Sequence, residues 1–373
     1  VAALWREVLG QRLLRRPRLS RIYYDRKFYN YPLKIGNAFS NLGFARSTRI
    51  MLSLMRSRLF PRRPERTFTD WVSNRFGHAL FETFFRSYTE KVWGISCEEL
   101  SADWAAQRIR NLSLAKAIFQ AMGFGAKRSV ASLIEEFDYP EFGPGQMYEE
   151  MARRAGEMGA ALRKQTEVVA VEHRSEQATA VRVQTPSGVE RIPAGRAVIS
   201  SMPLNELVKS MDPAPPGDVL DAAERLQYRS LITVNLLLDE PAPVPDTWMY
   251  LHDRDLAAGR IQFYNNWSPK MSPRPEQSVI GLEYFATAGD RLWTLSDDQA
   301  RALAVEDLGK LGLVSARNVF DVFRVRYANA YPVYNDGYAE HVARIRQWLS
   351  RIGNLYPVGR YGQFRYNNMD HSI

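Results

Sequence analysis

The last fifteen residues constrain the fold more than any other stretch of the chain. An apolar run through Leu355, Tyr356 and Val358 predicts a buried strand that leads into Gly359. A turn with a second glycine follows, and Met369 stands where a final helix would begin. A helix N-terminus presents unpaired N–H groups and the positive end of the helix dipole. The turn between this strand and the start of the helix is therefore expected to attract electron-rich groups.

Arg360 places a cation directly after the glycine that ends this strand. A solvated surface charge is the plain alternative, but an arginine next to a glycine at a strand end is better explained by a ligand. A strand end, a helix start and a cation can together hold the electron-rich edge of a flavin ring or a pyrophosphate. The sequence therefore predicts a cofactor-facing turn over residues 359–370.

Both ends of the sequence look cut. The chain begins at Val1 without a methionine and stops one turn into the expected last helix. We expect the 373 residues to be an internal piece of a longer polypeptide. Their number suggests two to three domains, or one large two-domain enzyme.

Composition narrows the class of protein. Apolar residues make up 45% of the chain, which is ordinary for a globular protein with a large core. No apolar run approaches the ~18 residues of a membrane span. Cys97 is the only cysteine, so an internal disulfide and a cysteine-based metal site are excluded. A cytoplasmic location is the default expectation.

Positive charge is concentrated near the N-terminal end. Residues 1–66 hold 16 Lys and Arg against 3 Asp and Glu, whereas the remaining 307 residues hold 34 against 38. The segment is either a solvated basic face or a docking surface for a nucleotide, an acidic lipid surface or nucleic acid. Nucleic acid is the weakest of these, because no zinc-finger spacing or RNA-binding motif is recognisable. We therefore expect no nucleic-acid partner and keep peripheral membrane contact as an open alternative.

The strongest helical signal covers residues 67–93. Thr67 followed three residues later by an aspartate is a capping pattern, and apolar residues recur every four positions until Gly94 ends the pattern. Residues 1–66 read as helical and irregular, with prolines as breaks. Two further helices are expected, at 101–119 and 129–137.

From residue 145 the pattern alternates between helix and strand. Alternating β-branched residues predict strands, and longer amphipathic runs predict helices. The expected strands are 166–172, 178–185, 197–201, 231–238, 248–251, 260–264, 279–285 and 319–327, and the expected helices are 145–158, 296–311 and 336–351. This order predicts a discontinuous two-domain α+β fold, in which a nucleotide-binding sheet is completed by segments far apart in sequence.

Several kinds of site are unsupported by any motif. The five histidines are scattered without metal-ligand spacing, and neither a Gly-x-Ser-x-Gly elbow nor a P-loop is present. The dinucleotide fingerprint is also absent. Gly123-Phe124-Gly125 and Gly143-Pro144-Gly145 lack the third glycine and the preceding strand. The residues alone thus predict no metal ligand and no catalytic residue.

Aromatic residues gather at the C-terminal end of the 67–93 helix. Phe84, Phe85, Tyr88 and Trp93 are most simply core residues, because core-facing positions recur at helical spacing. The alternative is a flat stacking platform for a nucleobase, with Tyr88 and Trp93 offering a polar edge.

These segments resemble the UDP-galactopyranose mutases. Residues 84–94 are similar to the aromatic helix motif of the mutases, residues 27–33 to their Tyr-Asn-Leu-Pro segment, and residues 359–370 to their flavin-binding end. Three further segments resemble the wider protoporphyrinogen oxidase and amine oxidase superfamily: 159–171, 197–203 and 327–334. The resemblance covers nearly the whole chain.

The resemblance implies an enzyme that uses FAD. It implies an α/β FAD-binding domain, incomplete here because the unit with the glycine fingerprint would precede Val1, and a substrate domain with an antiparallel sheet and a helical region. The implied cofactor-binding residues are Val168, Gly359, Arg360, Met369 and Asp370. The implied residues for a small-molecule substrate, for example a nucleotide sugar, are Phe84, Phe85, Tyr88, Trp93, Arg108 and Tyr366, with Arg108 serving a phosphate.

The resemblance also sets the expected domain boundaries. Residues 1–142 would be a mostly helical basic region that contains the aromatic helix. Residues 143–210 would form part of the FAD-binding domain, residues 211–335 the substrate domain, and residues 336–373 the return to the FAD-binding domain.

The sequence departs from the mutases within the shared motifs. Asn368 stands where they carry Asp, Ser87 where they carry Gly, and Val92 where they carry Gln. The first hypothesis is therefore an FAD-dependent oxidoreductase that transfers a hydride from an organic substrate to the flavin. The alternative is a mutase-like nucleotide-sugar isomerase with no net redox change. A third hypothesis is a non-enzymatic binding module that uses the basic N-terminal segment.

Overall fold

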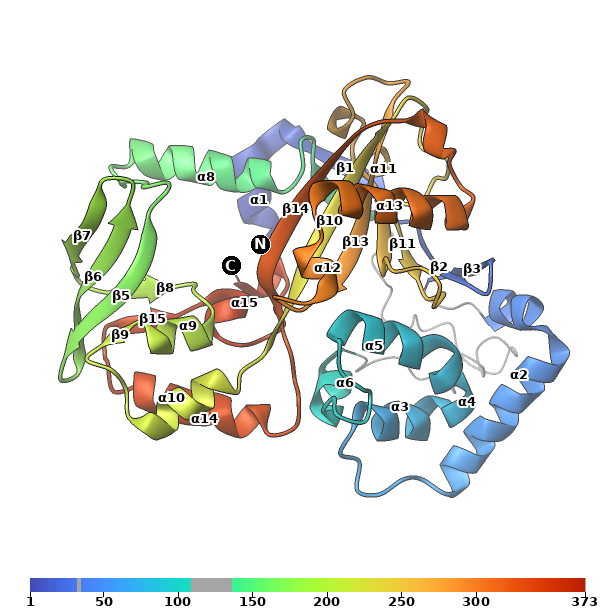
Figure 1. Ribbon diagram of the computed structural model, residues 1–373, viewed down its shortest axis with the longest axis horizontal. Helices are drawn as coiled ribbons and strands as arrows, with labels where there is room; N and C mark the ends of the chain where they lie inside the picture. The colour runs from blue at the N-terminus through green and yellow to red at the C-terminus, as the bar shows by residue number, and fades with distance from the viewer. Residues whose placement is uncertain (32–34, 109–135, 373) are drawn as a thin grey trace. The chain divides into compact units, whose positions relative to one another are not determined.

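The computed structural model describes residues 1–31, 35–108 and 136–372 (Figure 1). The chain divides into two compact units, each with helices and sheets, so the predicted α+β class is confirmed. Unit 1 consists of Val1–Val8, Tyr148–Arg229 and Ala328–Ile373, and unit 2 consists of Leu9–Met147 and Ser230–Tyr327. Both units are thus assembled from segments far apart in sequence.

A seven-stranded sheet dominates unit 2, in the order β14-β10-β13-β12-β11-β2-β3. Its strands are β2 (Ser20–Tyr24), β3 (Lys27–Asn30), β10 (Tyr228–Leu238), β11 (Trp248–Leu251), β12 (Arg260–Phe263), β13 (Ser278–Ala286) and β14 (Val319–Pro332). Strands β10, β13, β12 and β11 pair antiparallel, β2 joins β11 in parallel, and β3 returns antiparallel to β2. All five strands predicted between residues 231 and 327 are present.

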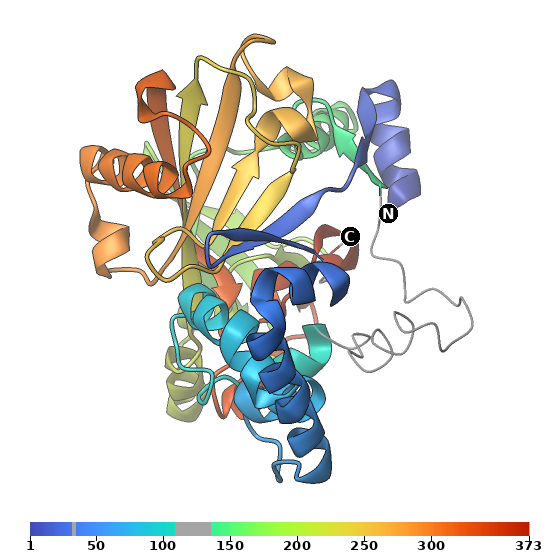
Figure 2. The ribbon, with the colours of Figure 1, turned by 90° about the vertical axis from the view of Figure 1, so that its right-hand side faces the viewer.

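One face of this sheet forms the core of unit 2. Successive side chains of a strand point to opposite faces, and Ile232, Val234 and Leu236 of β10 share one face, where each is at most 2% exposed. Helix α13 (Asp297–Leu311) lies across that face and contributes apolar residues to the same cluster (Figure 2). Ser296 begins α13 through a capping box with Gln299, as the predicted helix over 296–311 requires.

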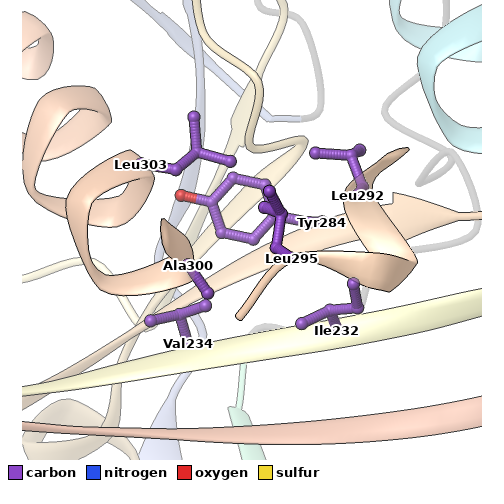
Figure 3. Close-up of a pocket in the computed structure, with 7 residues that line it drawn as sticks. All are labelled: Ile232, Val234, Tyr284, Leu292, Leu295, Ala300 and Leu303. Atoms are coloured by element: carbon purple, nitrogen blue, oxygen red, sulfur yellow. The ribbon is translucent and has the colours of Figure 1, made fainter. Parts of the chain in front are cut away.

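A small apolar pocket remains between α12 (Arg291–Thr294), α13 and the sheet (Figure 3). It is lined by Ile232, Val234, Tyr284, Leu292, Leu295, Ala300 and Leu303. Its volume of about 10 Å³ is at the lower limit for holding one water molecule, so it belongs to the packing of the core and has no room for a substrate.

The helical region of unit 2 does not contain the continuous helix predicted over 67–93. Helix α3 (Phe68–Phe76) ends at Gly77, whose φ of +85° is a backbone conformation that favours glycine. A Cβ on Gly77 would lie 2.7 Å from the backbone nitrogen of Leu54 in α2 (Ile35–Leu59), so the break also lets two helices approach closely. The chain resumes as α4 (His78–Leu80), the π-helical turn η2 (Phe81–Arg86) and α5 (Ser87–Trp93).

The remaining helical predictions in this part of the chain are only partly described. Helix α6 (Ala102–Arg108) begins the element predicted over 101–119, and the rest of that range lies outside the described residues. The helix predicted over 129–137 also falls mostly outside them. Its last two residues belong to β4 (Glu136–Pro140), which pairs antiparallel with β1 (Leu13–Pro17). The remaining short helices of unit 2 are η1 (Gly10–Arg12), which precedes β1, and α11 (Tyr264–Trp267), η3 (Pro269–Met271) and η4 (Ala316–Asn318).

The prediction that residues 1–66 are helical and irregular was wrong for residues 13–30. These residues form β1, β2 and β3. Strand β2 pairs with β11, more than two hundred residues away, with Tyr250 opposite Ile22. The local pattern of arginines between apolar residues does not reveal a strand whose partner is so distant.

Unit 1 contains a four-stranded sheet and a parallel pair of strands. The sheet has the order β7-β6-β5-β9, and the pair is β15 with β8. The strands are β5 (Glu167–Arg174), β6 (Gln177–Thr185), β7 (Gly188–Pro193), β8 (Val198–Ser200), β9 (Met211–Asp212) and β15 (Leu355–Pro357). The predicted strands at 166–172, 178–185, 197–201 and at the C-terminal end are confirmed, whereas β7 and β9 were not predicted.

Short helices complete unit 1. They are α1 (Ala2–Leu9), α8 (Gly145–Glu157), α9 (Leu204–Lys209), α10 (Gly217–Glu224), α14 (Tyr338–Leu349), α15 (Gly359–Gly362) and α16 (Met369–Ser372). Helices α8, α14 and α16 confirm the predictions at 145–158, 336–351 and after Asn368. Of the helices in the described part of the chain, none combines the length and the apolar character that crossing a membrane requires.

Candidate active site

The C-terminal turn of unit 1 is built on the parallel pair of strands. Pro357 of β15 lies opposite Ser200 of β8, and the backbone N–H of Val358 donates to the Ser200 carbonyl at 2.8 Å. A Cβ on Gly362 would lie 2.9 Å from that same carbonyl oxygen. Glycine at this position therefore lets α15 approach the end of β8.

Gly359 opens the turn to its surroundings. Its φ is +74°, and a Cβ built on it would meet no protein atom within 4 Å. The backbone at the end of β15 thus has free space beside it among the described residues, which allows the close approach of a ligand.

Arg360 lies over the faces of two tyrosines. Its guanidinium carbon is 5.3 Å from the ring centre of Tyr331 and 4.8 Å from that of Tyr366, and the two rings stack with an interplanar angle of 11°. Nε donates to the carbonyl of Asn367 at 2.8 Å, and Nη1 to the carbonyl of Ala330 at 3.5 Å. Both acceptors are uncharged, and no described carboxylate forms an ion pair with this arginine. The positive charge is held in place without being neutralised, which suits an electron-rich ligand.

The other predicted cofactor residues lie in two places. Met369 begins α16 and is 42% exposed, and Asp370 follows it with a side chain outside the described part. Val168 lies half-buried in β5, opposite Val183 of β6, on the separate four-stranded sheet. The structure thus gathers four of the five residues on the C-terminal turn, and their roles stay predictions.

In unit 2 the face of the sheet opposite the core is polar and aromatic. The register places Trp248 opposite Gln262 and Tyr250 opposite Arg260, and it places Arg260 opposite Glu283. Because neighbours in register share a face, these side chains from three strands form one continuous surface. A sheet face that only needed to be buried would carry apolar side chains here.

An ion pair between the half-buried Arg260 and the buried Glu283 occupies this polar face. Arg260 Nε donates to Glu283 Oε2 at 2.7 Å, and Gln262 Nε2 donates to Glu283 Oε1 at 2.7 Å. Glu283 is only 4% exposed. A buried carboxylate is costly unless it is paired and hydrogen-bonded, so these three side chains fix one another's positions.

Tyr264 covers the neighbouring part of the face. Its hydroxyl donates to Asn235 Oδ1 at 3.1 Å, and a Cβ on Gly281 would lie 2.6 Å from the same hydroxyl oxygen. The absence of a side chain at Gly281 therefore makes room for the tyrosine ring on the sheet.

Aromatic rings continue the face along β11. Trp248 stacks on Trp267 with ring centres 5.2 Å apart and an interplanar angle of 17°. Tyr250 contacts Tyr88 edge-on at 5.7 Å and Tyr31 at 4.9 Å. Such a row of rings offers flat apolar surface with polar edges, which is typical of ligand-binding surfaces.

Four buried polar atoms on this face have no hydrogen-bond partner among the described residues. They are Nε1 of Trp248, which is a donor, Nδ1 of His252, Oγ of Ser20 opposite Trp248, and the hydroxyl of Tyr29 opposite Ile22. Nearly all buried polar atoms in native proteins are hydrogen-bonded. Nε1 of Trp248 and Nδ1 of His252 are therefore candidate positions for a hydrogen bond to a ligand or to a water molecule.

The imidazole ring of His252 stacks on the ring of Tyr88. The two rings are parallel within 12° and 4.4 Å apart. Burial and the nearby charge of Lys91 lower the pKa of His252 to about 3. A hydrogen bond with the Phe84 backbone has a smaller, opposite effect on this pKa. The imidazole is accordingly neutral at physiological pH and acts as a flat platform for the tyrosine.

Lys91 anchors the connection between β11 and β12 to α5. Its Nζ donates to the carbonyls of Leu251, Asp253 and Ala258 at 3.0, 3.0 and 3.2 Å. Burial lowers the pKa of Lys91 to about 8, although nearby aspartates oppose this shift. The lysine thereby fixes the position of α5, which carries Tyr88, relative to the end of β11.

The predicted aromatic substrate residues divide into two groups. Tyr88 is half-buried and reaches the polar face of the sheet. Phe84 and Trp93 are at most 4% exposed and pack edge-on against Tyr29 and Trp104, and Phe85 stacks on Phe76. Phe84 and Trp93 are thus core residues, whereas Phe85 and Tyr88 are half-buried and Tyr88 reaches the polar sheet face.

Two predicted substrate residues lie elsewhere. Arg108 ends α6, and its side chain lies outside the described part of the chain. Tyr366 belongs to unit 1, where it stacks on Tyr331 beside Arg360. Their roles in substrate binding stay predictions.

Sequence reasoning missed most residues of the polar sheet face. Trp248 and Tyr250 alternate with the buried Met249 and Leu251, and this period of two was the available signal. No local pattern marks Glu283, because its strand is buried on both faces and reads as a continuous apolar run.

The sequence matches the model of one known protein family over most of its length. The model of the flavin containing amine oxidoreductases matches residues 23–366. The chain belongs to this family. FAD is accordingly its cofactor, and the predicted relationship to the amine oxidase superfamily is confirmed. No curated protein matches the sequence.

Three solved structures illustrate the similarity in fold. Reduced UDP-galactopyranose mutase superposes with a TM-score of 0.81 at 17% identity, over 99% of this chain and 78% of the mutase chain. A putative protoporphyrinogen oxidase from Exiguobacterium sp. 255-15 gives 0.70 at 18% identity, over 96% and 79%. Putrescine oxidase bound to putrescine gives 0.58 at 13% identity, over 97% and 84%.

The C-terminal turn fits the flavin of this family of flavoproteins. Gly359 leaves free space beside the backbone, and Arg360 supplies a cation without a carboxylate partner among the described side chains. Both features suit the electron-rich edge of a flavin ring. The residues of this turn are thus compatible with the cofactor, and their cofactor-binding roles stay predictions.

Proposed function

We propose that this protein is an FAD-dependent oxidoreductase that oxidises a small organic substrate. The observation that carries the proposal is the un-neutralised guanidinium of Arg360, held over Tyr331 and Tyr366 beside the open backbone of Gly359. When bound, FAD accepts a hydride from a substrate carbon and leaves an oxidised product.

The residues of the chain bind and orient the reactants. Arg360 would hold the electron-rich side of the flavin by charge, and Tyr331 and Tyr366 keep the guanidinium in place. In unit 2, Tyr88, Tyr250 and Trp248 would bind a flat or apolar part of the substrate. The unpartnered Nε1 of Trp248 would donate a hydrogen bond to a substrate acceptor.

The cofactor part of the proposal is tested with the full-length polypeptide. We expect the purified protein to show the visible absorbance bands of bound flavin. The Arg360→Met variant should bind FAD roughly 10–100-fold more weakly, because it loses a charged hydrogen-bond donor. Arg365→Met is the matched control, since Arg365 is exposed and lies in the same segment. Equal FAD affinity of the two variants would contradict the role of Arg360.

The reaction itself is tested by anaerobic substrate screening. Loss of the oxidised-flavin absorbance on adding an organic amine or a related small substrate is the expected result. Trp248→Ala and Tyr250→Ala should raise the substrate concentration needed for this bleaching and leave the amount of bound FAD unchanged.

A mutase-like isomerase is the second candidate. It is supported by the motif resemblance at residues 84–94 and by the shared fold of the UDP-galactopyranose mutase structure. The test is to mix the protein with UDP-galactopyranose and dithionite and to look for the furanose form. Its formation would replace the oxidoreductase proposal.

A further inference from the structure

Helix α2 carries an apolar stripe on its outer side. After a kink at Gly43, where φ is +77°, the helix continues to Leu59. Phe44, Leu52, Met55 and Leu59 recur at spacings that keep them on one side of a helix. They are 89%, 61%, 55% and 74% exposed. Long apolar side chains in such an array are expensive to leave in water.

This stripe is not the side that holds α2 to the rest of unit 2. The side that packs inward carries Ile50 and Leu54, each 7% exposed, and it rests on α3 and α4. The close approach of Gly77 to the backbone of Leu54 fixes this contact. The helix is therefore apolar on two sides, and only one side is used by the fold that the structure describes.

Arginines border the outer stripe. Helical geometry places Arg49 and Arg56 along one edge and Arg58 along the other. All three are exposed, and none forms an ion pair with a described carboxylate. Residues 35–64 contain six arginines and no aspartate or glutamate. An exposed apolar stripe between rows of arginine is the pattern of helices that lie in the interface of a membrane.

We propose that α2 docks this protein on anionic phospholipid surfaces. The stripe formed by Phe44, Leu52, Met55 and Leu59 would enter the boundary between headgroups and acyl chains. Arg49, Arg56 and Arg58 would bind lipid phosphates at its edges, with their carbon stems along the apolar surface. The proposal concerns a surface of unit 2 and does not depend on the reaction.

The arginines and the apolar stripe of α2 together disfavour two other partners, a second copy of the chain and nucleic acid. A second copy related by a two-fold axis would bring the same arginines of both copies together, which is repulsive. Nucleic acid would bind the arginines but would leave the apolar stripe in water. An anionic lipid surface satisfies both the charge and the apolar side chains.

Vesicle co-sedimentation tests the proposal directly. The full-length protein is mixed with vesicles of phosphatidylcholine alone or with phosphatidylserine added at about one third of the lipid. We expect binding to the anionic vesicles, weaker binding as salt rises, and little binding to the neutral ones. Absence of binding to the anionic vesicles at low salt would overturn the proposal.

Two sets of substitutions separate the charged and the apolar contributions. Arg49→Gln/Arg56→Gln/Arg58→Gln should weaken vesicle binding by at least about tenfold. Phe44→Gln/Met55→Gln/Leu59→Gln should weaken it by a similar factor. All these side chains are exposed, so folding is expected to persist and is checked by circular dichroism.

The matched control is Phe320→Gln/Phe323→Gln, which removes two aromatic side chains on β14 that are about half exposed, at 49% and 51%. Its vesicle binding should equal that of the unmodified protein. Full binding by the apolar α2 variant would instead indicate a purely electrostatic polyanion surface. Loss of a dimer in that variant would assign the stripe to a second copy. Either result contradicts lipid docking.

A fluorescent label reports insertion independently of affinity. Thr48→Cys places a thiol on the exposed side of α2, within the hollow lined by Phe44, Ser47 and Met51. Cys97, the native cysteine, is fully buried, and burial raises its pKa, so the label should react at position 48 alone. An environment-sensitive dye there should shift to shorter wavelength with anionic vesicles. An unchanged spectrum on bound vesicles would exclude insertion.

Discussion

At the scale of single residues, burial decides what the polar side chains of unit 2 do. His252 is 5% exposed and lies beside Lys91, so its neutral form is favoured. Glu283 is equally buried, yet it remains paired with Arg260 across two strands. The same environment thus makes one group a neutral platform and the other a member of an ion pair.

The depressed pKa of His252 predicts a loss of stability in acid. The folded-state pKa of about 3 lies below the ordinary value of 6.5, so below pH 6.5 the unfolded chain binds a proton that the folded chain does not. Between pH 7 and pH 5 this group should lower the free energy of unfolding by about 2 kcal/mol. His252→Phe keeps a ring against Tyr88 and cannot be protonated. Denaturant unfolding should therefore show that the free energy of unfolding of the variant falls by about 2 kcal/mol less between pH 7 and pH 5 than that of the unmodified protein. An equal fall in both proteins would refute the assignment.

The ion pair on the polar sheet face predicts a non-additive pair of substitutions. Arg260→Met leaves Glu283 buried and unpaired, which should cost about 3–5 kcal/mol. Arg260→Met/Glu283→Leu removes both charges and should recover most of that loss. Denaturant unfolding of the two single variants and the double variant gives the coupling free energy. The second single variant is Glu283→Leu. If the loss of unfolding free energy in the double variant equals the sum of the losses in the two single variants, the pair is not coupled.

At the scale of elements, close helix approach explains the break in the helical pattern after Phe76. The apolar repeat continues through Gly77, so the sequence pattern does not show the interruption. The structure ends α3 there because the glycine adopts a positive φ and its missing Cβ makes room for the α2 backbone. Packing between two helices therefore overrides the local repeat.

Gly77→Ala tests this contact between elements. The added Cβ would lie 2.7 Å from the backbone nitrogen of Leu54, and the positive φ adds strain. We expect a loss of roughly 2 kcal/mol or more in the free energy of unfolding. Gly156→Ala is the matched control, because it lies in α8 and its Cβ would meet no atom within 4 Å. That change should be neutral or stabilise by up to about 1 kcal/mol, and equal effects of both changes would contradict the packing argument.

At the scale of the whole molecule, the two units are joined by continuous secondary structure. The chain passes between them after Val8, Met147, Arg229 and Tyr327. The last two crossings fall inside β10 and β14, which are neighbours in the sheet of unit 2. No flexible linker separates the units at these strands, so unfolding of the sheet also disturbs unit 1.

This connectivity predicts cooperative unfolding. We expect one calorimetric transition for the full-length protein, with equal calorimetric and van't Hoff enthalpies. Leu236→Ala in the core of unit 2 should cost about 2–5 kcal/mol and move the whole transition. Two separate transitions, of which only one moves in the variant, would show that the units unfold independently.

The amino-acid sequence was sufficient to predict the α+β class, most strands after residue 166 and the relationship to the amine oxidase superfamily, whereas the cofactor-facing role of Gly359 and Arg360 stays a prediction. These features are set by short-range patterns: alternation within a strand, repeats within a helix, and a motif of a few adjacent residues. They are therefore visible without any knowledge of spatial neighbours.

The folded structure was needed to establish the pairing of β2 with β11, the break at Gly77 and the polar sheet face. It also decided which aromatic of the 84–93 segment reaches a surface. Each of these depends on residues that are distant in sequence and meet through strand register or helix packing. Local patterns carry no information about such partners, because the free energy that selects them arises from burial and pairing in the folded state.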